Sequence, residues 1–342
     1  MTQSNPFPDN FVTGMDVGGT KVHVADTRSS TVQRYKTSDY PDMYTLLDDY
    51  FAKIGAQPTH VAVAMAGPRN DETGVIKMTN TPWPAFDPQE AHKRYPNITF
   101  STANDMFAMT AGALQESTIN LQQLKPGTPV VNGAKLVVAP GTGLGIGAAV
   151  WDQYAKRYTC IASEGGHTSF HLQPRNKLEA GYVDYLHKKH PHASLELAIA
   201  GKYGVDNLVD YCLEALQATE LQQAIQRARQ AERPTGAVLL EFATEGKNDT
   251  QKAAHDILEC LGGIMGTILS DLALHYKATG GIYLAGSVGL GLGEYLAEKT
   301  SMNERFVRTG SVHHDMVQKM PIYLLINPNI AVVGALSLAK QA

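Results

Sequence analysis

The sequence predicts an α/β fold divided into two lobes. Strand-like and helix-like segments alternate along the first half of the chain, which is typical of layered α/β proteins. Two strand-like runs around a glycine turn begin the chain near residue 11, and a second pair of this kind occurs near residue 135. The 342 residues also exceed what one hydrophobic core usually organises. We therefore expect two lobes with a cleft.

The first half predicts a β-hairpin followed by alternating strands and helices. Alternating or continuous apolar residues mark the strands, and apolar residues at helical spacing mark the helices. The expected strands are 11–16, 21–25, 32–37, 61–65 and 97–101, and the expected helices are 44–54 and 106–115.

The second half predicts a second hairpin and then a more helical region. Two strands flank a glycine turn within 135–150, and helices are expected at 182–187, 205–218 and 251–275. The glycines of the last of these helices predict close packing, inside the chain or against nucleotide or a second subunit. A strand at 281–285, a glycine-rich turn at 286–293, a helix from Glu294, a strand at 322–326 and a helix at 330–340 complete the expected elements.

The charge balance argues against two classes of partner. Lys and Arg number 29 against 33 for Asp and Glu, a net charge of −4, and like charges form no run. We therefore expect no nucleic-acid surface and no anionic-membrane surface. With 43% hydrophobic and 18% charged residues, the composition is that of a globular protein, not of a disordered or fibrous one.

The sequence favours a cytoplasmic location. No apolar stretch approaches the ~18 to 20 residues needed to cross a bilayer, and the first residues lack the basic and apolar regions of a secretion signal. Cys160, Cys212 and Cys260 are too few and too scattered for a disulfide framework or a Cys-rich zinc site. We expect these thiols to be reduced and mostly buried.

The first hairpin carries a candidate phosphate site. Its turn has the sequence Asp16-Val-Gly18-Gly19-Thr20. Successive glycines let backbone N–H groups approach a ligand, Thr20 adds a hydroxyl, and Asp16 can approach a cation or its water shell. Phosphate with magnesium suits this combination, and a tight turn without a ligand is the alternative.

The second hairpin carries a similar turn, which contains Gly141, Thr142, Gly143 and Gly145. Its glycine spacing resembles a dinucleotide-binding fingerprint, but a strand-like stretch follows where that motif requires a helix. Two glycine turns on two hairpins are more specific than either turn alone.

Asn104 and Asp105 are candidates for the reacting centre. They follow an apolar strand and open a helix, at the strand end where α/β folds place their ligands. A carboxylate there can accept the proton of an alcohol that attacks phosphorus, which is the base role in phosphoryl transfer. A simple helix cap is the alternative, because both residue types cap helices well.

Glu164, His167 and Glu196 are candidates for binding hydroxyl groups. Glu164 and His167 flank two glycines, which can hold the loop against a ligand and leave a carboxylate and an imidazole to form hydrogen bonds. A glycine-rich loop with a satisfied histidine is the alternative. Glu196 taken alone is typical of a solvated helix residue.

These segments together resemble a known superfamily. Asp16 to Thr20, Gly141 to Gly147 and Leu284-Ala-Gly-Ser-Val288 resemble the two phosphate segments and the adenosine segment of the actin, hexokinase and heat-shock-chaperone ATPases. Within that superfamily, the segments around Asp105, Glu164 to His167 and Glu196 are similar to the sugar-binding segments of bacterial-type glucokinases. The resemblance runs from about Thr13 to the C-terminal helix.

The resemblance implies a two-lobed, actin-like (ribonuclease H-like) ATPase fold with nucleotide and sugar in the interlobe cleft. The implied small lobe comprises residues 1–112 and 327–342, and the implied large lobe comprises 113–326. A homodimer is also implied.

The implied activity is transfer of the γ-phosphoryl group of ATP to the 6-hydroxyl of glucose. Asp105 would be the general base, and the other sugar hydroxyls would be held by Asn104, Glu164, His167 and Glu196. The two glycine turns would cradle phosphates, Asp16 would orient hydrated Mg²⁺, and the adenosine would be bordered by Gly286, Ser287 and Gly289.

One departure keeps alternatives open. Lys21 stands where the best-known glucokinases of this branch carry Asn, and it makes the turn look like that of the ROK kinases, although their Cys-rich zinc segment does not occur here. A kinase for mannose or an N-acetylated hexosamine is therefore a second hypothesis. A non-catalytic sugar sensor is a third, disfavoured because the residues before Asp16 could not build a helix-turn-helix. The phosphoryl donor, ATP against ADP or polyphosphate, also stays open.

Overall fold

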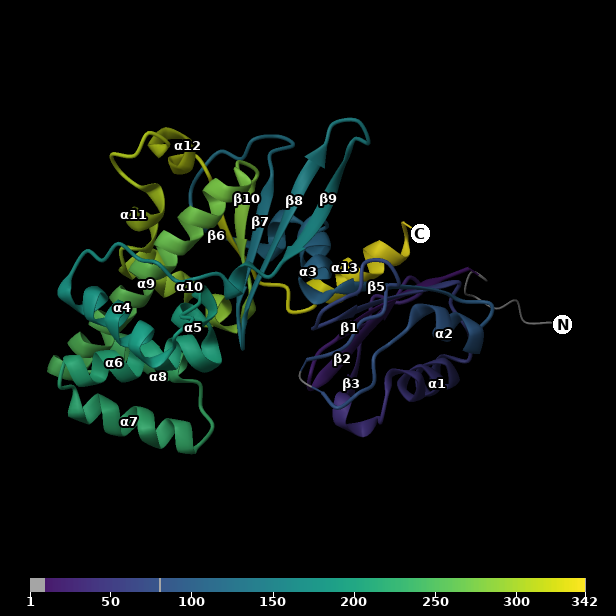
Figure 1. Ribbon diagram of the computed structural model, residues 1–342, viewed down its shortest axis with the longest axis horizontal. Coiled ribbons are helices and arrows are strands. Elements are labelled where there is room, and N and C mark those ends of the chain that lie inside the picture. The colour runs from purple at the N-terminus through teal and green to yellow at the C-terminus, as the bar shows by residue number, and fades with distance from the viewer. Residues whose placement is uncertain (1–9, 80, 342) are drawn as a thin grey trace. The chain divides into compact units, whose positions relative to one another are not determined.

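Figure 1 shows the computed structural model, which describes residues 10–79 and 81–341. The chain divides into two compact units. The first unit runs to Ser117 and takes in Cys160–Ala162 and the residues from Asn327 onward, and the second comprises Thr118–Thr159 and Ser163–Ile326. The two lobes that the resemblance implies, 1–112 with 327–342 and 113–326, stay a prediction.

The first unit is built on a five-stranded mixed sheet in the order β3-β2-β1-β4-β5. Strands β1, β2 and β3 are antiparallel, whereas β4 and β5 run parallel to β1. The elements are β1 (Val12–Val17), β2 (Lys21–Asp26), β3 (Gln33–Lys36), η1 (Thr37–Asp39), α1 (Met43–Ile54), β4 (His60–Met65), α2 (Pro88–Arg94), β5 (Thr99–Asn104), α3 (Asp105–Ala113) and α13 (Ile330–Ala339). The strands and helices predicted in this half are confirmed, with small shifts at their ends.

The two faces of this sheet pack differently. One face joins α1 in an apolar cluster that includes Met15, Leu46 and Val63, all fully buried. The other face is covered by α3 and α13, which pack against each other and against β1. A side chain at Gly334 would clash with the carbonyl oxygen of Ala108, so the two helix backbones touch there. The last helix of the chain thus completes the first unit.

The second unit is built on a six-stranded sheet in the order β6-β11-β10-β7-β8-β9. As in the first unit, a hairpin (β7 and β8) is followed by two strands parallel to its first strand (β10 and β11). This repetition confirms the second beginning predicted near residue 135. The elements are η2 (Thr118–Asn120), β6 (Leu121–Lys125), β7 (Lys135–Pro140), β8 (Leu144–Asp152), β9 (Arg157–Ser163), η3 (Gly165–His167), α4 (Lys177–Lys189), α5 (Leu195–Ile199), the π-helical η4 (Gly201–Val205), α6 (Asp206–Ala215), α7 (Thr219–Gln230), α8 (Thr235–Glu245), α9 (Asn248–Tyr276), β10 (Gly281–Leu284), α10 (Gly286–Lys299), α11 (Met302–Val307), α12 (His314–Gln318) and β11 (Ile322–Leu325).

Helix α9 is the core helix of the second unit. It has 29 residues and contacts α5, α6, α7, α8, α10, α11 and α12 (Figure 1). By length and composition it could cross a membrane, but 78% of its most apolar window is buried in the structure. The expectation that no apolar stretch approaches that length is therefore wrong, because a helix surrounded by others is apolar on most sides. Its Gly262 and Gly266 face Thr300 and the Met302 backbone, so the close packing is within the chain.

The predicted turn at 286–293 is wrong, because α10 begins at Gly286. The chain turns from β10 into this helix through Gly286, whose φ is +73°. Val288, Leu292 and Leu296 are buried at four-residue spacing, and added Cβ atoms at Gly289 and Gly293 would lie within 3.3 Å of Leu284. Helix packing on the strand therefore overrides the poor helix propensity of glycine.

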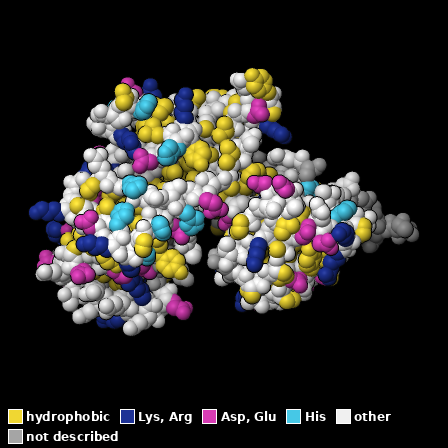
Figure 2. All heavy atoms as spheres, in the orientation of Figure 1, with side chains coloured by type: hydrophobic (Ala, Val, Ile, Leu, Met, Phe, Trp, Pro, Cys, Tyr) yellow, Lys and Arg dark blue, Asp and Glu magenta, His cyan; other side chains and the backbone are white. Residues whose placement is uncertain are grey.

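Charged side chains of both signs are mixed on the surface. On the face drawn in Figure 2, Lys and Arg lie scattered among Asp and Glu on both units. Exposed pairs such as Lys93 with Glu90 and Lys252 with Asp256 belong to this mixture. Such pairs contribute little to stability because water and salt screen them.

The glycine contact between α3 and α13 predicts a stability effect. Gly334→Ala should lower the free energy of unfolding by about 2 to 3 kcal/mol, because the added methyl group must push two helix backbones apart. Urea unfolding followed by circular dichroism measures this loss. Ser337→Ala on the same helix is the control and should change stability by less than about 0.5 kcal/mol. Equal effects of the two substitutions would contradict the packing argument.

Candidate active site

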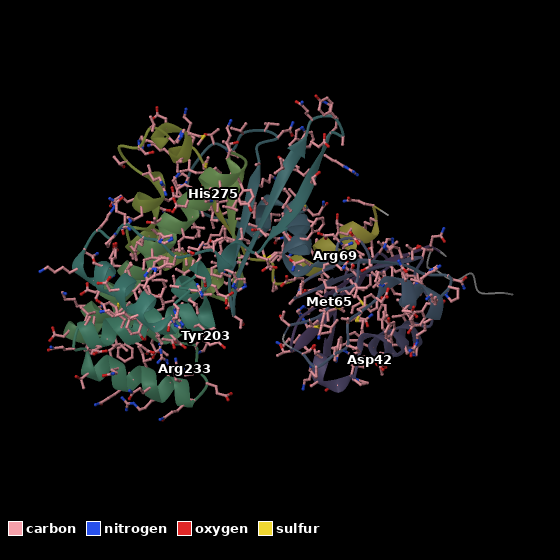
Figure 3. All side chains as sticks on the ribbon, in the orientation of Figure 1. Asp42, Met65, Arg69, Tyr203, Arg233 and His275 are labelled. Carbon is pink, nitrogen blue, oxygen red and sulfur yellow. The ribbon has the colours of Figure 1, made fainter. Side chains whose placement is uncertain are left out.

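The register of three strands aligns the predicted residues of the first unit. Asp16 of β1 lies opposite Ala64 of β4, and Met65, labelled in Figure 3, lies opposite both Val17 and Asn104. Because β1, β4 and β5 are parallel, their carboxyl ends meet at one edge of the sheet. Asn104, the last residue of β5, and Asp16, the next-to-last residue of β1, therefore lie at the same edge, where the first glycine turn begins.

Asn104 and Asp105 form the junction between β5 and α3. The Asn104 side chain caps the helix, since its Oδ1 accepts a hydrogen bond from the Met106 amide at 2.8 Å, and its Nδ2 donates to the Gly67 carbonyl at 3.2 Å. Asp105 is the first helical residue, is half-buried, and accepts from the same Met106 amide at 2.9 Å. The partial positive charge of the helix N-terminus favours a negative charge at Asp105. The cap alternative thus describes Asn104 correctly, while Asp105 keeps a carboxylate at the sheet edge.

The turn at Gly18 to Thr20 is fixed by a residue that sequence reasoning missed. The Gly18 amide donates to the Lys21 carbonyl at 2.9 Å, and the Thr37 hydroxyl donates to the Gly18 carbonyl at 2.9 Å. The Thr37 amide also donates to the Thr20 carbonyl at 3.1 Å. A threonine just after the third strand carried no motif that could have identified it. Lys21 itself is exposed beside this turn.

Asp16 has a neighbour across the hairpin. The Nδ1 of His23 lies 3.4 Å from its Oδ2, and about a fifth to a quarter of each side chain is exposed. The register pairs the two residues directly across β1 and β2. Asp16 is therefore oriented by a single long contact in the part of the chain described here, which leaves carboxylate oxygen positions for a cation or its water.

In the second unit, the structure brings two predicted nucleotide segments together. The Gly141 amide donates to the Gly143 carbonyl at 2.8 Å, which closes the turn between β7 and β8. A Cβ added at Gly141 would lie 3.8 Å from both the amide nitrogen and the hydroxyl of Ser287. The second glycine turn thus lies against the N-terminus of α10, where backbone N–H groups favour anions.

The predicted sugar residues of the second unit gather around Leu144. The Leu144 amide donates to Oε2 of Glu196 at 3.1 Å, and Gly166 of η3 packs directly against the Leu144 carbonyl oxygen. Glu164 and His167 lie at the two ends of that η3 turn, with side chains 80% and 63% exposed and 3.9 Å between Oε2 and Nε2. Their exposure leaves both side chains available to a ligand.

A pocket of about 1050 Å³ lies next to the second glycine turn. Gly141, Thr142 and Ser287 line one part of it, and the rest comes mainly from α8 and the segment before it. Arg233, labelled in Figure 3, is one of these residues and donates to Glu241 at 2.8 Å. The further lining residues are Val205, Asp206, Arg229, Glu232, Pro234, Thr235, Gly236, Ala237, Leu240, Glu241, Thr244, Glu245, Val288, Gly291 and Leu292.

Arg229, one of the lining residues, is the centre of a hydrogen-bond network. Its guanidinium donates to Asp210 at 2.6 Å, to Asp206 at 3.0 Å and to the Thr235 hydroxyl at 3.2 Å. The Thr235 hydroxyl in turn donates to Asp206 at 2.6 Å. Sequence reasoning missed these residues because α7 and α8 carry no recognisable motif.

Four predicted nucleotide residues of the second unit do not line this pocket: Gly143, Gly145, Gly286 and Gly289. Gly289 faces Leu284, so its missing side chain allows α10 to pack on β10. Gly145 pairs with Ala139 inside the sheet. Packing on Leu284 therefore explains the glycine at 289, and Gly145 belongs to the strand pairing.

Comparison with known proteins agrees with this geometry. The family model described as Glucokinase matches residues 14–342. The glucokinase of Chromobacterium violaceum is 28% identical over 324 residues, which cover 93% of this chain and 86% of the relative.

Solved structures share the fold. A glucokinase from an Antarctic psychrotroph has a TM-score of 0.78 at 23% identity and is covered over 97% of this chain and 99% of its own. The glucokinase from Balamuthia mandrillaris, solved in complex with glucose, has a TM-score of 0.73 at 18% identity, with 97% and 94% covered. The predicted actin-like α/β fold is confirmed by these likenesses. Since the family model also extends from the first strand to the last residue, the chain belongs to the glucokinase family.

Proposed function

We propose that this chain transfers the γ-phosphoryl group of ATP to the 6-hydroxyl of glucose, with Asp105 as the general base. Membership of the glucokinase family supports the reaction and does not favour a sugar sensor or a kinase for another sugar. The observation that carries the base assignment is the shared edge of β1, β4 and β5, where Asp105 follows β5 and Asp16 lies near the end of β1, before a glycine turn.

The proposed chemistry requires one proton transfer. As the glucose 6-oxygen forms a bond to the γ-phosphorus, the bond from that phosphorus to the β,γ-bridging oxygen breaks and ADP leaves. The hydroxyl proton passes to the carboxylate of Asp105. A carboxylate at the first position of α3 suits this role, because it lies where β5 ends and a carboxylate is already in its proton-accepting form at neutral pH.

The remaining sugar hydroxyls are proposed to bind Asn104, Glu164, His167 and Glu196. Carboxylates and an imidazole can accept hydrogen bonds from hydroxyls, and the Asn104 amide can both donate and accept. Support comes from the exposure of Glu164 and His167 and from the contact that ties Glu196 to the same Leu144 as their turn.

The nucleotide is proposed to bind in the pocket of the second unit. Its volume of about 1050 Å³ suits a nucleotide, since ligand pockets typically measure roughly 300–1,000 Å³. Gly141, Thr142 and Ser287 would bind phosphates, and apolar residues such as Leu240 and Leu292 would pack on the base. The turn at Gly18 to Thr20 would hold the phosphate that is transferred.

Mg²⁺ is proposed to bind beside Asp16. In the described residues no group of three or more His, Cys, Asp or Glu could hold a metal ion. Mg²⁺ usually keeps several waters and binds through one or two carboxylates and substrate phosphates. The Asp16 carboxylate and the Thr20 hydroxyl are hard oxygen ligands of the type Mg²⁺ prefers. When bound, the ion neutralises the negative charge of the phosphates.

We also propose that the chain is a homodimer and acts in the cytoplasm, where it supplies glycolysis with glucose 6-phosphate. The family resemblance supports the dimer. The three free cysteines suit a reducing compartment.

A sugar panel tests the substrate assignment. With MgATP, glucose should exceed mannose, fructose, N-acetylglucosamine and N-acetylmannosamine in kcat/KM by at least about tenfold, because a pocket that hydrogen-bonds each hydroxyl rejects analogues that lack or block one. A coupled assay for ADP release, with a control without sugar, measures the rates. Equal efficiency on glucose and N-acetylglucosamine would contradict the assignment.

Substitution of the proposed base tests the mechanism. Asp105→Ala should lower kcat about 100- to 10,000-fold and leave the Kd for glucose, measured by calorimetry, nearly unchanged. Glu90→Gln is the control, since it removes an exposed carboxylate from the first turn of α2. Near-normal turnover of the Asp105 variant would refute the base role.

The proposed metal contact predicts a changed magnesium requirement. Asp16→Asn should raise the Mg²⁺ concentration for half-maximal rate by about 10- to 100-fold, because a residue that holds the hydrated ion loses its charge. Rates measured across a magnesium titration at saturating ATP and glucose test this. Asp39→Asn, which changes a carboxylate of η1, serves as the control. An unchanged magnesium profile for the Asp16 variant would exclude the contact.

A further inference from the structure

The side chain of Glu196 contacts the phosphate-binding turn directly. Its Oε2 accepts the hydrogen bond of the Leu144 amide at 3.1 Å, and Leu144 follows the turn Gly141 to Gly143. The side chain is half-buried, so water competes with this contact only in part. A residue proposed to bind sugar therefore also holds a backbone donor next to the phosphate site.

Gly143 makes this contact possible. A Cβ built at Gly143 would lie 2.8 Å from Oε2 of Glu196, closer than real Cβ atoms approach an oxygen. The turn thus has a glycine here because the carboxylate occupies the space of a side chain. The clash would fall on the far end of a flexible side chain, so a methyl group at Gly143 would displace the carboxylate rather than the backbone.

The backbone that carries Glu196 is fixed. The Ser194 hydroxyl caps α5 by accepting from the Leu197 amide at 3.3 Å, and the Leu195 amide donates to the Thr168 carbonyl at 3.0 Å. Thr168 directly follows η3, which carries His167 at its end. Only the side chain of Glu196 is therefore free to exchange the Leu144 amide for another donor.

We propose that Glu196 is a positioning residue that couples the sugar site to the phosphate site. Without sugar, its carboxylate occupies the Leu144 N–H and places a negative charge beside the turn, which weakens phosphate binding. Hydroxyls of a bound sugar donate to the same carboxylate, release the amide and disperse the charge. The sugar thereby raises the affinity of the turn for nucleotide phosphates. This inference rests on the proposed role of Glu196 as a sugar ligand.

The first test needs no sugar and no turnover. Calorimetry should show that Glu196→Gln and Gly143→Ala bind the ATP analogue AMPPNP with Mg²⁺ about three- to tenfold more tightly than wild type, as expected for one charge removed or displaced near a partly solvated anion site. Adenosine, which lacks phosphates, should bind all three proteins equally. Glu220→Gln, which removes a first-turn glutamate of α7, should match wild type.

The second test adds glucose. Wild-type protein should bind AMPPNP several-fold more tightly with saturating glucose, and this gain should largely vanish in both variants. In Gly143→Ala the carboxylate remains, so a lost gain there points to the contact and not to the sugar ligand alone. The double variant Glu196→Ala/Gly143→Ala should bind AMPPNP no more tightly than Glu196→Ala, because the methyl group then has no carboxylate to displace.

Two results would overturn the coupling. One is an unchanged AMPPNP affinity in both single variants without sugar, and the other is an equal change in adenosine affinity, which would indicate a general effect on the pocket. Failure of the proposed function has a different signature. In that case wild-type protein does not phosphorylate glucose, whereas the sugar-free AMPPNP measurements still report whether Glu196 restrains the turn.

Discussion

Parallel pairing of β1, β4 and β5 is the constraint on which the first unit and its chemistry depend. The register fixes Val17, Met65 and Asn104 side by side, so the strand ends form one edge. A shift by one residue would turn each side chain to the opposite face. The buried cluster with α1 resists such a shift, because it requires the apolar set that includes Met15 and Val63 on its side. Core packing and the placement of the candidate base are therefore set by the same pairing.

Much of this arrangement could be predicted from the sequence. Glycine turns on hairpins, apolar strands and the residues that follow them are local signals, and each appears near its expected place. The two predicted hairpins, near residues 11 and 135, indicate that both sheets follow the same pattern. Glu164 and His167 are candidates from the glycine loop that they flank, and the resemblance adds Glu196, but nothing local indicates that Leu144 connects them. That link depends on a backbone amide, which every residue except proline carries and no motif reveals.

The parts that could not be predicted depend on contacts distant in sequence. Gly286 to Gly293 looks like a turn by composition, and only packing on Leu284 makes it a helix. The pocket residues of α7 and α8 are held by Arg229 through carboxylates about 20 residues away in the chain. Thr37 fixes the first turn from the third strand's end. In each case the residue that fixes the local structure is of a common type, and its role follows only from its contacts in the folded chain.

Helix α13 has a consequence for the order in which the protein can form. The chain supplies the strands of the first unit within its first third, yet α13, which covers their second face, follows every strand of both sheets in the sequence. Until then the face that includes Gly14 and Ala64 lacks its cover. Because domains generally fold as units, the first unit cannot finish folding until residues 330–339 have been synthesised. That face of the first sheet therefore stays exposed to solvent until α13 has been synthesised.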